Sequence, residues 1–123
     1  MSKVAYHNSM DAALNDVKSN GNILHICSAQ PANYAGIAAV TLGNVALASG
    51  DYTLQDGAVS GRRVTVAQKT VTGTGGGTAG FIVIADTANT RIKTVTTCPS
   101  YTMANGVPVV VASFDAWEIE DPT

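Results

Sequence analysis

Short strand-like runs separated by turn residues dominate the chain from Asp51 onward, and they constrain its fold more than any other feature. Runs such as Arg62–Thr72 and Phe81–Ala85 are rich in Val, Ile and Thr, which favour strands. Composition agrees, because 14 Val, 14 Thr and 12 Gly make up 40 of the 123 residues. Turn signals recur every roughly 8–12 residues, as in a β-sandwich or small barrel. We predict a mainly β fold of about six to eight antiparallel strands.

One segment has the spacing of a helix rather than a strand. Four apolar side chains at positions i, i+3, i+4 and i+7 form a single stripe, which predicts an N-terminal α-helix over residues 9–20. The stripe consists of Met10, Ala13, Leu14 and Val17. Ser9 can cap the start, and Gly21 is available for a left-handed residue after the end. A helix this short needs a sheet to cover its apolar stripe.

The strands differ in how many of their faces are apolar. Residues 22–28 alternate, and residues 35–48 predict a short irregular turn followed by a strand near Val40–Leu47. Phe81–Ala85 is apolar on both faces, as in a central strand covered on both sides. Val107–Ile119 predicts one long strand with Val110, Ala112, Phe114 and Ala116 on one face. Trp117 and Ile119 then take the apolar role from the opposite face, which calls for a bulge or bend near Asp115.

These segments predict a single domain over residues 1–123. Its parts are an N-terminal arm (1–8), the helix (9–20) and a β-rich body (22–120). The Asn105-Gly106 pair indicates a hairpin. Gly75, Gly77 and Gly80 match the G-x-G-x-x-G spacing of dinucleotide sites, but they precede a strand instead of a helix. They therefore predict a hairpin or a close strand crossing.

Few residues offer catalytic or metal chemistry. His25 and Cys27 share one face of a predicted strand, and Cys98 or His7 could join them around zinc. The paired short spacings of structural zinc sites are absent, so we expect a half-buried histidine beside reduced cysteines. Serine-nucleophile motifs are also absent, although distant residues can assemble a triad. We therefore expect no enzyme activity, no catalytic residue, no cofactor and no metal.

Charge excludes other classes of partner. Seven basic and nine acidic residues give a net charge of −2, so we expect neither nucleic acid nor a membrane as partner. The main cations lack the interleaved aromatics of single-strand binders; they are Arg62, Arg63, Lys69, Arg91 and Lys93. Four acids near the C-terminus could form a carboxylate pair or a calcium site, but a solvated chain end is the favoured interpretation. They are Asp115, Glu118, Glu120 and Asp121. The first residues lack a signal-peptide pattern, so synthesis in a cytoplasm is expected.

The order of hydrophobic and turn residues resembles that of small virion proteins of tailed bacteriophages and related prophages. The similarity spans nearly the whole chain and is carried by hydrophobic and turn residues, not by a catalytic signature. It includes Leu24–Ser28 (LHICS), Gly61–Val66 (GRRVTV), Ile84–Asp86 (IAD) and Glu118–Pro122 (EIEDP). The sequence departs from the family pattern at Asn89–Ile92, where the family has a Gly-containing turn.

This resemblance implies a β-rich, non-enzymatic capsid decoration (cement) protein on the capsid surface of the virion, made in the host cytoplasm. Its implied partner is the major capsid protein, and it would itself form a dimer or trimer. The capsid contacts would come from one sheet edge and from the arm, namely Ser2, Lys3, Val4, Ala5, Tyr6, His7 and Asn8. The alternatives are a tail, baseplate or fibre-associated structural protein and a surface carbohydrate-binding module, with an enzyme last.

Overall fold

The computed structural model describes residues 7–57 and 61–119, with side chains from Ser9 onward. The fold is mainly β with an N-terminal helix, as predicted. The helical elements are α1 (His7–Asn20), η1 (Tyr34–Gly36), α2 (Ile37–Val40) and η2 (Ser49–Asp51). The strands are β1 (Ile23–Cys27), β2 (Thr41–Ala46), β3 (Tyr52–Asp56), β4 (Arg62–Val66), β5 (Lys69–Gly73), β6 (Gly77–Asp86), β7 (Arg91–Met103), β8 (Pro108–Val111) and β9 (Phe114–Ile119).

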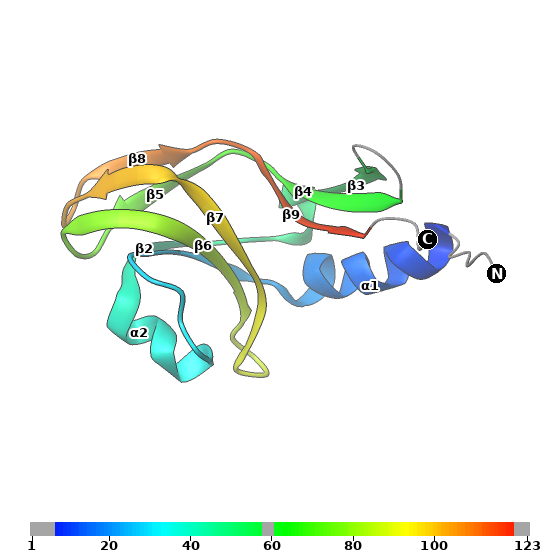
Figure 1. Ribbon diagram of the computed structural model, residues 1–123, viewed down its shortest axis with the longest axis horizontal. Helices are drawn as coiled ribbons and strands as arrows, with labels where there is room; N and C mark the ends of the chain where they lie inside the picture. Colours follow the sequence, from blue (N-terminus) through cyan, green and yellow to red (C-terminus); the bar gives the residue numbers. More distant parts are fainter. Residues whose placement is uncertain (1–6, 58–60, 120–123) are drawn as a thin grey trace.

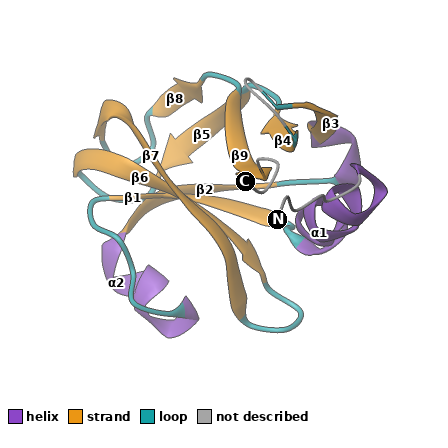
Figure 2. Cartoon of the chain, turned by 45° about the vertical axis from the view of Figure 1, so that its right-hand side comes forward, coloured by secondary structure: helices purple, strands orange, loops and turns teal. Residues whose placement is uncertain are grey.

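The strands form two antiparallel sheets. The larger sheet has the order β7-β6-β1-β2-β5-β8 and curls into a half-barrel (Figure 1). The smaller sheet has the order β3-β4-β9. Helix α1 packs beside β3 and β4, and α2 lies on the other side of the larger sheet (Figure 2). The two short helical elements η1 and α2 therefore cover a face of the sheet that α1 does not reach.

The main core lies between the concave face of the half-barrel, the smaller sheet and α1. The predicted stripe of α1 is confirmed, because Met10, Leu14 and Val17 are at most 3% exposed. Leu14 and Val17 join the cluster that contains Leu24 of β1 and Val64 of β4. The helix begins at His7, two residues before the predicted start, and ends at Asn20 as predicted.

Gly21 follows α1, and the expected left-handed conformation there is wrong. Its φ is not positive; among the described residues, positive-φ glycines are Gly61, Gly77 and Gly106. The side chain of any other residue would instead lack space. A Cβ on Gly21 would lie 2.7 Å from Ile84 Cγ2, from the Tyr52 hydroxyl and from the Val17 carbonyl oxygen.

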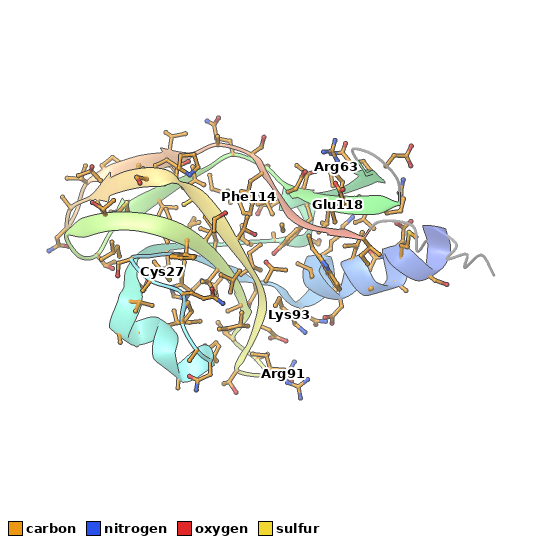
Figure 3. The ribbon with its side chains drawn as sticks, in the orientation of Figure 1. Cys27, Arg63, Arg91, Lys93, Phe114 and Glu118 are labelled. Atoms are coloured by element: carbon orange, nitrogen blue, oxygen red, sulfur yellow. The ribbon has the colours of Figure 1, made fainter. Side chains whose placement is uncertain are left out.

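A second, smaller core covers the convex face of the larger sheet. It contains Cys27, Ile37, Val83 and Ala85, and Figure 3 shows Cys27 between the sheet and α2. The prediction of a strand covered on both sides is confirmed for β6, where residues 82–85 are at most 2% exposed. The predicted irregular turn followed by a strand is also confirmed, since η1 and α2 lead into β2.

The two longest predicted runs are each divided between the sheets. Arg62–Thr72 breaks after Val66 into β4 and β5, and Val107–Ile119 breaks after Val111 into β8 and β9. Because β4 pairs with β9 and β5 with β8, the two runs lie side by side through both sheets and bend at the same level. These divisions give nine strands among the described residues, against the six to eight expected.

The predicted bulge near Asp115 is confirmed. Val64 pairs with Trp117 and Thr65 with Asp115, so Ala116 is the extra residue of β9. The predicted faces are wrong, however. Val110 is 52% exposed whereas Val111 is buried, and Trp117 is 42% exposed. The bend between β8 and β9 interrupts the alternation that a single regular strand would keep.

Both predicted turns are present, but the Asn105-Gly106 turn does not join two paired strands. The Asn105-Gly106 turn closes with a bond from Val107 N–H to Ala104 O of 3.1 Å, and Gly106 has φ 78°. It joins β7 to β8 at opposite edges of the larger sheet, so it is not a hairpin. Residues 74–76 connect β5 to β6. Because β2 and β1 lie between these two strands in the sheet, the connection is the predicted strand crossing and not a hairpin.

Candidate protein-binding surface

One end of the molecule is built from segments without charged side chains. Residues 19–50, 70–85 and 94–114 contain no Asp, Glu, Lys or Arg. Strand pairing brings these segments together, because Gly43 is opposite Gly73 and Gly77 is opposite Met103. Gly73 N–H also donates to the Val107 carbonyl at 3.0 Å. We call the region where these segments meet, formed by residues 42–44, 72–79 and 101–110 at the left of Figure 1, the uncharged end.

Strand β8 is an edge of the larger sheet at the uncharged end. Within the described residues it pairs with β5 alone, through the register Val71 to Val109 and Thr70 to Val110. Val107 and Val110 are 48% and 52% exposed, and they are two of the three large exposed apolar side chains of the described chain. An exposed apolar edge strand is a template for pairing with another chain. The short length of β8 and Pro108 at its start limit that pairing to a few residues.

Many of the charged side chains pair with one another, and one of them, Lys69, lies opposite Val111 at the far end of β8. Arg62 binds Asp11 of α1 and Asp56 of β3, each at 2.9 Å. The other ion pairs are Arg63–Asp115 (3.0 Å), Lys69–Asp51 (3.1 Å) and Lys93–Asp16 (2.9 Å). They tie α1 to both sheets and β4 to β9. Four of the five predicted surface cations therefore bind carboxylates of the chain itself, and Arg91 is exposed near the β6–β7 turn (Figure 3).

The C-terminal acids have separate surroundings. Asp115 also accepts a hydrogen bond from the Thr65 hydroxyl at 3.1 Å, and Glu118 lies opposite Arg63 in the β4–β9 register. Glu120 and Asp121 lie outside the described residues. Asp115 is thus a structural partner of β4 rather than part of a solvated chain end.

His25 and Cys27 share one face of β1, but the structure does not bring Cys98 to them. Cys98 packs against the main core, whereas Cys27 belongs to the core on the opposite face. Burial raises the pKa of the Cys27 thiol to about 11. It also lowers the pKa of His25, whose Nδ1 lies 3.0 Å from the Thr41 hydroxyl. Within residues 7–57 and 61–119, no three metal-ligating side chains cluster.

The predicted interface arm falls mostly outside what the structure describes. Ser2, Lys3, Val4, Ala5 and Tyr6 lie outside the described residues. His7 and Asn8 belong to the first turn of α1 instead of an arm, and their side chains are not described. Strand β8 is the candidate for the sheet edge that we expected to contribute to the interface. Sequence reasoning missed the uncharged end, although its signal is visible as three long charge-free segments.

A crevice lies between β7 and β9, away from β8. Its walls are Lys93, Thr94, Val95, Ala116 and Trp117, and its volume is about 230 Å³. The Thr94 hydroxyl is buried there without a hydrogen-bond partner among the described residues. Trp117 is therefore an exposed aromatic beside a polar recess.

Comparison with models of known families, with curated proteins and with solved structures gives no significant match to this chain. None of the helices in the described part of the chain is long and apolar enough to cross a membrane.

Proposed function

We propose that the chain is a non-enzymatic capsid decoration protein of a tailed bacteriophage, which binds the assembled major capsid shell and stabilises it. The observation that carries the proposal is the uncharged end with the open edge strand β8. The centres of protein interfaces are depleted of charged residues, and sheet edges bind extended segments of partner chains. The phage assignment itself rests on the resemblance of the sequence to small virion proteins.

The proposed mechanism is stabilisation by binding. A protein that binds the assembled shell, but not its dissociated subunits, shifts the equilibrium toward the shell by mass action. The uncharged end suits this role because burying Val107 and Val110 removes apolar surface from water, and the segment that carries them, residues 94–114, has no charged side chain to desolvate. Self-association as a dimer or trimer would place several such ends on neighbouring shell subunits.

The test is binding of the purified protein to shells that lack it. Shells are incubated with the protein, sedimented and quantified by gel densitometry, with Val110→Glu as the test variant. Thr53→Glu is the matched control, because it adds the same charge at an exposed strand position of the smaller sheet. We expect the unmodified protein and the control to bind in hundreds of copies, and Val110→Glu to lose about tenfold or more in affinity because it buries an unpaired charge. Equal binding of all three proteins would refute the assignment of the surface.

Copy number also separates this function from the first alternative. A tail, baseplate or fibre component would be present in a few copies per particle and would remain with tails after the heads are removed. That result would replace the decoration function while keeping a structural role.

The crevice at Trp117 favours the carbohydrate-binding alternative. Exposed aromatic rings beside polar groups provide both an apolar contact and hydrogen-bonding partners. Glycan-array binding that disappears in Trp117→Ala but not in Val110→Glu would support it.

A further inference from the structure

A pocket lies on the convex face of the larger sheet, under residues 28–40. These residues leave the sheet after β1 and return to β2, and a bond of 2.9 Å from Ser28 N–H to the Val40 carbonyl closes the loop at its base. Compact loops of this kind are frequently functional. The pocket has a volume of about 400 Å³, within the usual range of ligand sites. It is lined by His25, Tyr34, Ala35, Ile37, Ala38 and Thr41.

The hydrogen bonds of Thr41 indicate which nitrogen of His25 is protonated. The Thr41 hydroxyl has one hydrogen and donates it to the Gly43 carbonyl at 3.1 Å. It can therefore only accept from His25, so Nδ1 carries the hydrogen across the 3.0 Å contact. The other ring nitrogen, Nε2, then presents a lone pair. It has no hydrogen bond to a described residue and is not among the buried atoms that lack a partner, so it is at least partly accessible from outside.

The lining of the pocket defines the chemistry of its ligand. Of the four residues contributed by η1 and α2, three are aliphatic, namely Ala35, Ile37 and Ala38, and the fourth is the aromatic Tyr34. No Asp, Glu, Lys or Arg lines the pocket, so a charged ligand would find no counter-charge there. The site therefore suits an uncharged apolar body with one hydrogen-bond donor. A tyrosine side chain has this combination and is enriched at protein interfaces.

We propose that this pocket receives a tyrosine side chain of the shell protein, whose phenol donates to His25 Nε2. The partner named here rests on the proposed function. All six lining residues fall within the charge-free segment 19–50, which also contributes β2 to the uncharged end. Burial lowers the pKa of His25, which favours the neutral imidazole that this hydrogen bond needs.

The first experiment tests the pocket alone by NMR, using the uncharged probe N-acetyltyrosinamide. We expect saturable shift changes at Tyr34, Ile37 and Thr41, and binding of N-acetylphenylalaninamide to be weaker by about fivefold, the factor for one net hydrogen bond. The imidazole ¹⁵N shifts should report an Nδ1–H tautomer. In Thr41→Val the tautomer should no longer be fixed, and the preference for the hydroxylated probe should fall. Equal binding of both probes, or no shift changes in the pocket, would overturn the proposal.

The second experiment connects the pocket to the shell. His25→Phe keeps an aromatic ring but removes the acceptor, and it should reduce shell occupancy by about fivefold in the sedimentation assay. Thr53→Glu again serves as the control. Full occupancy by His25→Phe would overturn the assigned partner and leave the decoration function standing. Failure of the unmodified protein to bind shells would overturn the decoration function and the shell partner, whereas the NMR result on the pocket would still stand.

Discussion

Gly21→Ala tests whether three elements of the fold meet as tightly as the structure shows. The new Cβ would lie 2.7 Å from atoms of Ile84, Tyr52 and Val17, which belong to β6, β3 and α1. Overpacking of this kind costs about 1–3 kcal/mol. The Tyr52 hydroxyl, which donates to the Gly21 carbonyl at 2.7 Å, would also be displaced, at a further cost of about 1 kcal/mol. We therefore expect a loss of about 3 kcal/mol in the free energy of unfolding.

The physical cause can be isolated with a double-mutant cycle. Tyr52→Phe alone should cost about 1–2 kcal/mol, because it leaves the Gly21 carbonyl unpaired beside a buried ring. In the Tyr52→Phe background the hydroxyl is already absent, so Gly21→Ala should cost about 1 kcal/mol less than it does alone. The free energies of unfolding are measured by urea unfolding, and an m-value that does not change between variants is the check on two-state behaviour.

Gly50→Ala is the matched control. A Cβ on Gly50 meets no atom within 4 Å, so the free energy of unfolding should change by less than about 0.5 kcal/mol. If Gly21→Ala proved as harmless as Gly50→Ala, or if the two substitutions at Gly21 and Tyr52 were additive, the close approach described above would be refuted.

Three further predictions follow from the core and the ion pairs. Leu14→Ala, which empties a fully buried position, should lower the free energy of unfolding by about 2–5 kcal/mol in the same urea assay. In the folded protein at pH 8, iodoacetamide should label Cys98 before Cys27, because Cys27 is buried and its thiol pKa is raised to about 11. Peptide mass spectrometry would show the order of labelling, and the reverse order would contradict the prediction. Asp51 has a pKa below 3.8, chiefly because its carboxylate accepts a bond from Ala48 N–H. The stability that this carboxylate contributes is therefore complete above pH 3.8 and is lost as the pH falls through the lower pKa of the folded state. Asp51→Asn should make the loss of stability below pH 3.8 less steep. An unchanged slope would contradict this assignment.

Local patterns in the sequence were sufficient for several elements. The helical stripe around Leu14 and the two apolar faces of β6 are periodicities of a single segment, so they are visible without its neighbours. The bulge beside Asp115 was predicted at the right place, although the apolar faces from which it was inferred are wrong. These features depend on side-chain direction along one stretch of backbone.

Other features were decided only when distant segments met. The bends after Val66 and Val111 fall at the same level because β4–β5 and β8–β9 lie side by side, and neither run marks that level by itself. Gly21 is required by the approach of Ile84 and Tyr52, not by its own backbone angle. For the candidate sites, the sequence by itself determined that long stretches carry no charge and that His25 lies on a strand. Only the tertiary structure gathered three such stretches at one end and placed Thr41 beside His25, because strand order and cross-strand contacts depend on long-range packing.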